Sequence, residues 1–268
     1  LQCVEAAVNA ESFDEGMAVE RARFAECMSD PQREALIHIF FAERAANKIP
    51  GLPKDVPLLD INKGSVIGAG TMGGGIAMCF ANAGIPVRVH DNDSENLARG
   101  IKVIEGNYAR TVSKGRLTQE EMDKRMSLII PTENFDDLGD GDIVVEAVYE
   151  NLDLKKEIFA RLDKVMKQGA LLATNTSGLD VDAIAGMTDR PEFVCGMHFF
   201  SPANVMRLLE VVRGKDSSPV VLGTAMALGK RLGKVSVMAG NCPGFIGNRM
   251  LGGYTRQAAL MILEGATP

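Results

Sequence analysis

The sequence predicts an α/β fold built on a doubly wound, mostly parallel β-sheet. After about residue 60, short apolar runs alternate with longer helical stretches, which is the pattern of successive βαβ units. The first of these runs ends in a glycine-rich turn, and polar clusters follow several of the later runs. We expect a short helical segment before the sheet and a helical run after it.

Each element of this fold is predicted from its own residue pattern. The candidate strands are residues 65–67, 87–90, 143–146, 170–173, 193–197 and 235–238, which are short apolar runs. The candidate helices are residues 74–83, 95–114, 152–166 and 220–232. Strands and helices thus alternate as two covered sheet faces require.

The first 62 residues differ in character from the rest of the chain. Residues 12–47 predict two helices, because Asp30 and Pro31 supply an N-cap and a first-turn proline between two periodic segments. Prolines and a glycine then interrupt residues 49–57, a composition typical of linkers. We therefore expect a helical segment with its linker at 1–62, the sheet domain at 63–240 and a helical segment at 241–268.

Composition excludes several functional classes. The net charge is −6 and no basic block occurs, so nucleic acid is not an expected partner. The chain has no apolar run long enough for a membrane span. Its five cysteines are widely spaced and form no C-x-x-C pair, which indicates reduced thiols in an intracellular protein and predicts no metal site.

The glycine-rich turn after the first strand predicts a dinucleotide site on a Rossmann-type sheet. Gly68 allows a tight turn, Gly70 lets the backbone approach a pyrophosphate, and Gly73 lets the helix pack closely on the strand. Thr71 and Met72 lie between them at the start of the helix, whose free N–H groups and dipole favour phosphate.

An acidic residue supports the same prediction and selects the cofactor. Asp91 ends the second predicted strand, about 20 residues after the glycines, where a ribose-binding carboxylate is expected. A carboxylate accepts hydrogen bonds from the ribose hydroxyls and repels a 2′-phosphate, so NAD is favoured over NADP. The alternative is that Asp91 only shapes the turn that it forms with Asn92 and Asp93.

A histidine and a glutamate form the candidate catalytic pair. His198 follows an apolar run, and Glu210 lies within the apolar residues 208–212. A carboxylate among aliphatic side chains is costly unless it is paired, and a histidine is a suitable partner. Such a pair would orient the imidazole and raise its basicity, so that it could take a proton from an alcohol. From spacing alone, a core histidine without a catalytic role is an equal alternative.

Six ordered motifs between residues 63 and 249 resemble the 3-hydroxyacyl-CoA dehydrogenase family. The resemblance is to the version fused behind an enoyl-CoA hydratase in multifunctional fatty-acid oxidation enzymes. The motifs occupy residues 68–76, 142–150, 175–177, 196–202, 209–213 and 241–249. The resemblance implies NAD-dependent oxidation of an (S)-3-hydroxyacyl-CoA to the 3-oxoacyl-CoA in β-oxidation.

The resemblance also assigns roles to individual residues. It makes His198 the base that removes the C3 hydroxyl proton, with Glu210 orienting it, and it gives Ser177 and Asn248 to the substrate oxygens. It places four further residues at the NAD site, namely Glu146, Glu150, Lys155 and Asn175. Ser201 departs from the asparagine found in many relatives, which is expected to weaken or shift a neighbouring hydrogen bond.

The resemblance extends to the ends of the chain. Residues 1–62 resemble the tail of the hydratase half and its tether, and residues 241–268 the start of the helical C-terminal domain. Since the chain begins at Leu1 and ends at Pro268 after an apolar helical run, we expect a fragment of a longer protein. The whole protein is expected to be oligomeric, with a thiolase subunit as a candidate partner, in bacterial cytoplasm or, alternatively, in peroxisomes.

Two other functions compete with this one. The chain could be a catalytically incompetent NAD-binding fragment or scaffold, because most of the helical C-terminal domain is absent from it. It could also be a dehydrogenase of small free hydroxy acids, with Arg207 or Arg213 clamping the carboxylate. The motifs around His198 and Asn241 make the second alternative the weaker one.

Overall fold

The computed structural model describes residues 1–46, 48–49, 51–53 and 55–267. Asn47, Pro50, Lys54 and Pro268, which the sequence assigned to the second helix, the linker and the C-terminal segment, lie outside the described residues. The chain divides into two compact units, Leu1–Lys48 and Ile49–Pro268. Each unit is described separately.

The first unit consists of three helices, α1 (Gln2–Asn9), α2 (Phe13–Ser29) and α3 (Gln32–Ala46). The sequence predicted α2 and α3 but not α1. Ser12 caps α2 by accepting the Glu15 amide, and the Asp30 carboxylate accepts the Gln32 amide as expected for an N-cap. None of the described residues in these helices is buried, and α3 exposes apolar side chains that include Phe40 and Phe41.

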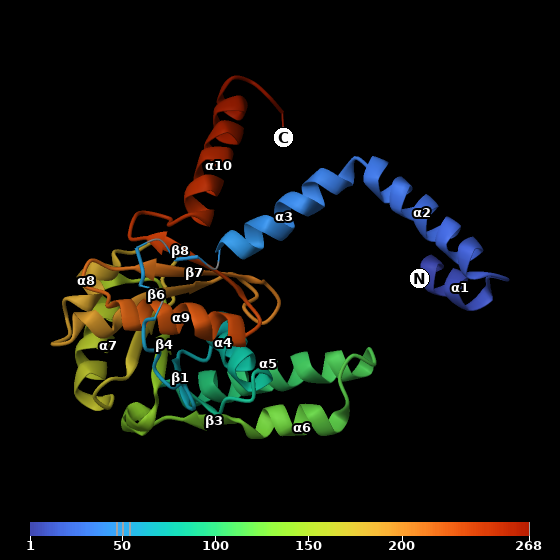
Figure 1. Cartoon of the computed structure of the whole chain (residues 1–268). Coiled ribbons are helices and arrows are strands. Elements are labelled where there is room, and N and C mark those ends of the chain that lie inside the picture. Colours follow the sequence, from blue (N-terminus) through green and yellow to red (C-terminus); the bar gives the residue numbers. More distant parts are fainter. Residues whose placement is uncertain (47, 50, 54, 268) are drawn as a thin grey trace. The chain divides into compact units, whose positions relative to one another are not determined.

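The second unit is built around a sheet of eight described strands in the order β3-β2-β1-β4-β5-β6-β7-β8. The pairs from β3 to β6 are all parallel, whereas β7 runs antiparallel to β6, and β8 runs parallel to β7 (Figure 1). This confirms the predicted doubly wound, mostly parallel sheet. The strands are β1 (Gly64–Ile67), β2 (Val87–His90), β3 (Ile129–Thr132), β4 (Ile143–Glu146), β5 (Leu171–Thr174), β6 (Val194–Phe199), β7 (Leu208–Arg213) and β8 (Val235–Gly240).

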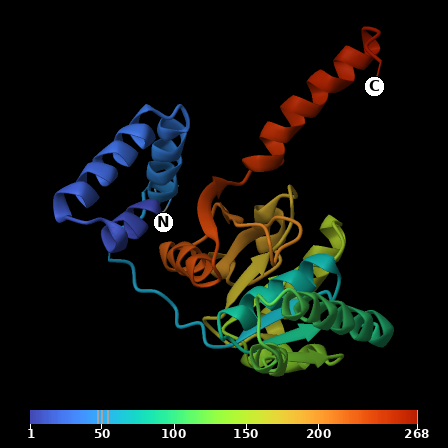
Figure 2. The same ribbon diagram turned by 90° about the vertical axis from the view of Figure 1, so that its right-hand side faces the viewer.

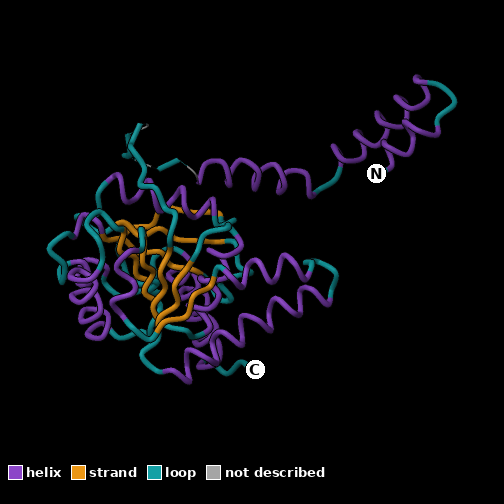
Figure 3. Tube along the Cα trace, turned by 90° about the horizontal axis from the view of Figure 1, so that it is seen from below, coloured by secondary structure: helices purple, strands orange, loops and turns teal. Residues whose placement is uncertain are grey.

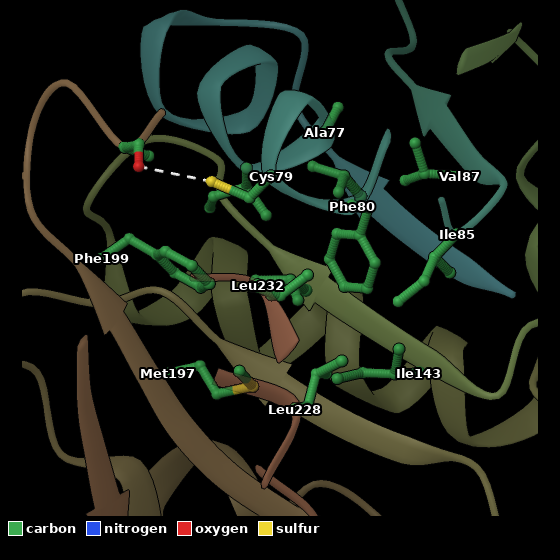
Figure 4. Close-up of a cluster of buried hydrophobic side chains, with 14 of the residues drawn as sticks. Ala77, Cys79, Phe80, Ile85, Val87, Ile143, Met197, Phe199, Leu228 and Leu232 are labelled. Atoms are coloured by element: carbon green, nitrogen blue, oxygen red, sulfur yellow. Dashed lines mark hydrogen bonds between the residues drawn. The ribbon is translucent and has the colours of Figure 1, made fainter. Parts of the chain in front are cut away.

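Helices cover both faces of this sheet (Figure 3). One core cluster joins one face to α4 (Thr71–Asn82), α5 (Ser94–Ser113), α6 (Gln119–Ser127) and α9 (Pro219–Arg231). A second cluster joins the other face to η1 (Phe135–Asp140), α7 (Leu152–Val165) and α8 (Val181–Ala185). In the first cluster Phe80 of α4 lies beside Ile143 of β4 and Leu228 of α9 (Figure 4), and all three are nearly inaccessible to solvent.

The sequence did not predict several elements of the sheet domain, which include β3, β7, α6 and α8. Strand β3 carries Pro131, which argues against a central strand, and the sheet accommodates it because β3 is an edge strand. Strand β7 was recognised only as an apolar run around Glu210. Helix α6 begins with a capping box in which Thr118 and Glu121 bond each other's backbone amides, a pattern visible in the sequence.

The last described helix is α10 (Gly247–Leu263), which lies within the helical segment predicted at 241–268. In Figure 2 this helix, in red, is joined to the sheet domain only by the helix's own N-terminal end and points away from the sheet. It buries none of its residues, and Met250, Leu251 and Tyr254 are among its exposed apolar side chains.

Close packing of α5 against the glycine-rich turn gives a test of the fold. A Cβ atom at Gly100 would lie 2.3 Å from the Ala69 carbonyl oxygen, whereas one at Gly106 would meet nothing within 4 Å. We expect Gly100→Ala to lower the free energy of unfolding by about 1–3 kcal/mol through overpacking. Gly106→Ala is the matched control, and should raise that free energy by about 0.5–1 kcal/mol through helix propensity. Urea denaturation measures both, and equal effects would contradict this packing.

Candidate active site

The glycine turn between β1 and α4 has the geometry of a phosphate-binding turn. Gly68 has φ +97°, and a Cβ there would lie 2.8 Å from the Ala147 carbonyl oxygen. A Cβ on Gly73 would lie 1.7 Å from the Gly68 oxygen, so no side chain fits there. Gly70 is the N-cap of α4, and a Cβ there would meet nothing within 4 Å. The open approach to Gly70 and the free helix N-terminus suit a pyrophosphate.

Two cavities flank this turn. One of about 540 Å³ is lined by residues that include Gly68, His90, Asp91 and Phe135. The other, of about 390 Å³, is lined by residues that include Thr71, Asp91, Arg99 and Asn107. Gly70 lines both cavities, so they meet at the turn. Met72 packs against the hydrophobic core instead of lining either cavity.

Asp91 shapes the turn and also faces the two cavities. One carboxylate oxygen accepts the Ala69 amide at 2.9 Å, and the other accepts the Asp93 amide at 3.2 Å. Because each carboxylate oxygen can accept a second hydrogen bond, both remain able to receive ribose hydroxyls. The two sequence interpretations of Asp91 are therefore compatible.

The second centre is a buried histidine and glutamate pair. His198 in β6 and Glu210 in β7 are direct cross-strand partners, and His198 Nδ1 lies 2.7 Å from Glu210 Oε2. The imidazole is 5% exposed and packs beside the rings of Phe200 and Phe245. Since Nδ1 is engaged by Glu210, Nε2 is the ring nitrogen that can accept a proton from a ligand.

Glu210 is held as a carboxylate by its neighbours. Burial raises the pKa of Glu210, but hydrogen bonds from His198, Gly247 and Ile246 outweigh it, so the net pKa is below the ordinary value. The two backbone amides belong to the N-terminus of α10 and donate to Oε1 at 2.7 and 3.1 Å. This end of the helix therefore stabilises the negative charge beside the histidine.

Ser177 and Asn248 are in direct contact. The Asn248 side-chain amide donates to the Ser177 carbonyl oxygen at 3.2 Å. The Ser177 hydroxyl donates to Glu150 Oε1 at 3.0 Å, and its backbone amide donates to the same oxygen at 2.7 Å. Burial raises the pKa of Glu150. The hydrogen bonds from Thr176 and Ser177 and the charge of Lys155 outweigh this effect, so the net pKa lies below the ordinary value.

The other residues assigned to the cofactor form ion pairs or hydrogen bonds within the protein. Glu146 is fully buried, and its carboxylate binds Lys155 Nζ at 2.6 Å. The Lys155 side chain is 1% exposed and also lies 3.3 Å from Glu150. Asn175 accepts the Phe199 amide at 2.9 Å and so joins the ends of β5 and β6.

The segment 241–249 reaches this site by an unexpected route. The segment follows a strand, and in an all-parallel sheet it would therefore begin at the carboxyl ends of the strands. Strands β7 and β8 run opposite to the other strands. Strand β8 therefore ends, with Gly240 paired to Arg213, near the amino ends of the parallel strands. The chain then returns, and Gly247 contacts Glu210 while Asn248 contacts Ser177.

Within the described ranges, no three His, Cys, Asp or Glu side chains are grouped so that they could hold a metal ion. None of the described helices is long and apolar enough to cross a membrane. All five cysteines are free thiols.

Comparison with known proteins identifies the class of this site. Residues 63–242 match the family described as 3-hydroxyacyl-CoA dehydrogenase, NAD binding domain. The chain therefore belongs to the 3-hydroxyacyl-CoA dehydrogenase family, as its six motifs predicted. This match confirms the family and the NAD cofactor, and the open glycine turn fits that cofactor.

Relatives of known name resemble the chain along most of its length. The peroxisomal bifunctional enzyme of Danio rerio is 44% identical over 274 residues, covering 100% of this chain and 37% of the relative. The fatty acid oxidation complex subunit alpha of a Psychrobacter species is 38% identical over 253 residues, covering 94% of this chain and 35% of the relative. The chain thus spans little more than a third of the length of these relatives.

Solved structures share the fold of the sheet domain. The 3-hydroxybutyryl-CoA dehydrogenase of Escherichia coli superposes with a TM-score of 0.76 at 38% identity, covering 78% of this chain and 44% of that one. The dehydrogenase part of multifunctional enzyme 1 of C. elegans gives a TM-score of 0.68 at 34% identity, covering 85% and 54%.

The position of Asp91 predicts cofactor selectivity. We expect Asp91→Asn to weaken NAD binding about tenfold or more, because a hydrogen bond to a charged group contributes ~1.5–3 kcal/mol. Binding of NADP should weaken less or improve, because the repulsion of the 2′-phosphate is removed. Asp93→Asn is the matched control, since asparagine caps helices as well as aspartate does. Titration calorimetry with both nucleotides measures the effect, and an unchanged NAD to NADP ratio would argue against a ribose contact.

Proposed function

We propose that this chain catalyses the NAD-dependent oxidation of (S)-3-hydroxyacyl-CoA to 3-oxoacyl-CoA in fatty-acid β-oxidation. The observation that carries the proposal is the buried pair of His198 and Glu210 within an NAD-binding domain of this family. The names of the relatives, which include 3-hydroxybutyryl-CoA dehydrogenase and fatty acid oxidation complex subunit alpha, support this substrate class.

His198 is the proposed general base. Nε2 takes the proton of the substrate's C3 hydroxyl as the hydride leaves C3. NAD, held at the glycine turn and Asp91, would supply the hydride acceptor. The positive charge that develops on the imidazole lies against the Glu210 carboxylate, which also fixes the ring through Nδ1. The α10 amides lower the pKa of Glu210 and keep it ionised, so a negative charge faces the imidazole as it takes the proton.

Ser177 and Asn248 are proposed to position the substrate oxygens. The Asn248 amide donates to the Ser177 carbonyl oxygen, so the two residues are neighbours although they come from segments that follow β8 and β5. Holding the reacting carbon in a fixed orientation converts a bimolecular step into an effectively unimolecular one. A hydrogen-bond donor at the C3 oxygen also stabilises the negative charge that develops there.

The wider organisation is also part of the proposal. Residues 1–62 are a hydratase-like tail with its linker, 63–240 the NAD-binding domain, and 241–268 the start of the helical dehydrogenase domain. An oligomeric whole protein and a thiolase partner are proposed from the resemblance. Bacterial and peroxisomal enzymes both occur among the relatives, and the higher identity to the zebrafish protein favours the peroxisome.

The competing functions fit the site less well. A catalytically incompetent scaffold has no need of a paired, buried His198 and Glu210. A carboxylate clamp by Arg213 is disfavoured, because this residue ends β7 near the amino end of β6, away from the carboxyl end that follows His198.

Turnover of acyl-CoA tests the proposal directly. NADH formation from (S)-3-hydroxybutyryl-CoA should fall by about 10²–10⁴-fold in His198→Ala, as expected for loss of a general base. NAD affinity should stay unchanged, and His38→Ala, an exposed histidine of α3, should behave as wild type. Unchanged turnover in His198→Ala would contradict the assigned base. NAD binding without turnover in the wild-type chain would favour the scaffold alternative.

A further inference from the structure

The segment that joins β8 to α10 is held in an unfavourable backbone conformation. Phe245 has φ +49°, which lies in the left-handed region, although its side chain is bulky. Such a conformation persists only where surrounding contacts hold it. The Phe245 side chain is 2% exposed and belongs to a small buried cluster with three partners, Val181, Val212 and Ala239. Contacts with α8, β7 and β8 therefore hold this segment.

Asn241, the first residue after β8, attaches the same segment to α8 by hydrogen bonds. Its side-chain oxygen accepts the Val181 amide at 3.1 Å, and its side-chain amide donates to Asp180 Oδ1 at 2.7 Å. The bond from Asn241 is the main cause that lowers the pKa of the Asp180 carboxyl below its ordinary value. Because a carboxylate only accepts and a backbone amide only donates, the two bonds fix one orientation of the Asn241 side chain. Asn241 thus ties the end of β8 to the N-terminus of α8.

The groups that follow Asn241 closely along the chain belong to the proposed catalytic centre. Glu210 Oε1 accepts the backbone amides of residues 246–247 at 3.1 and 2.7 Å. The next side chain, Asn248, donates to the Ser177 carbonyl oxygen at 3.2 Å. Because the chain between Asn241 and these groups is short, a shift at its start is passed on to its end.

We propose that Asn241 is a positioning residue, whose attachment to α8 brings the first amides of α10 to Glu210 and so places Asn248 in the site. Asn241 acts through the segment that follows it and takes no part in the reaction itself. The effect on turnover rests on the proposed function, whereas the attachment of α10 to Glu210 does not. The alternative is that the buried Phe245 side chain alone holds the segment, in which case Asn241 is dispensable.

The first variant removes the attachment. Asn241→Leu removes both hydrogen bonds and changes the size of the side chain little. If Asn241→Leu does not fold, Asn241→Ala removes the same two bonds without adding a large apolar side chain. Thermal denaturation establishes which of the two variants is folded.

The second variant exchanges the two partners, and a third is the matched control. Asp180→Asn/Asn241→Asp, the exchanged pair, lets an amide at position 180 donate to a carboxylate at position 241, which still accepts the Val181 amide. Asparagine caps helices as well as aspartate does, so α8 should keep its start. Gln119→Leu is the control, because it removes another amide-to-carboxylate hydrogen bond of 2.7 Å, which joins Gln119 to Asp123 on α6.

Turnover of (S)-3-hydroxybutyryl-CoA at saturating NAD gives the first measurement. We expect kcat to fall about tenfold or more in Asn241→Leu, because a small misplacement of positioned groups is costly in rate. NAD affinity should stay unchanged, since neither Asp180 nor Asn241 lines the two cavities at the glycine turn. The exchanged pair should recover most of the lost kcat, and Gln119→Leu should behave as wild type. An unchanged kcat in Asn241→Leu, or no recovery in the exchanged pair, would overturn the proposal.

A second measurement does not depend on activity. The Gly247 amide proton donates to the Glu210 carboxylate at 2.7 Å, so its NMR resonance should lie downfield. It should move upfield in Asn241→Leu and return in the exchanged pair. An unmoved resonance would overturn the proposed attachment. A moved and restored resonance without any turnover in the wild-type chain would uphold the attachment and count against the proposed function alone.

Discussion

The antiparallel pairing of β6 with β7 is the constraint on which the rest of the site depends. The register places His198 directly opposite Glu210, so that residues separated in sequence meet at 2.7 Å. Glu210 then receives the first amides of α10, and this contact fixes where the last helix begins. Asn248 follows directly and reaches Ser177. A change of register by one residue would turn Glu210 to the other face and separate all of these groups.

Among the described residues, the two buried glutamates of the sheet domain each have a side-chain partner, and this pairing links packing to chemistry. Glu210 is paired with His198, and Glu146 with Lys155, at contacts of 2.7 and 2.6 Å. Such pairs contribute little net stability, because desolvation offsets most of the attraction. Their effect is to give the carboxylates and the imidazole one fixed arrangement, which a catalytic site needs more than stability.

Much of the fold could be predicted from the sequence, because periodicity and turn chemistry are local. The glycine turn, Asp91 and all but two of the described strands were predicted in this way, and the family was recognised from ordered motifs. The reversed direction of β7 and β8 could not be predicted, because strand direction depends on long-range pairing. The resemblance assigned Glu146 and Lys155 to the cofactor site, and that assignment stays a prediction. The ion pair between the two side chains depends on tertiary packing, so local patterns could not predict it.

We propose that the site transfers hydride from C3 of the acyl group to NAD, and this transfer can be followed directly. The most direct measurement uses (S)-3-hydroxybutyryl-CoA with deuterium at C3 and mass spectrometry of the reduced cofactor. We expect the deuterium to appear in the nicotinamide ring and the reaction to be slower than with the protium substrate. Recovery of the deuterium in solvent, or a reduced cofactor without the label, would contradict it.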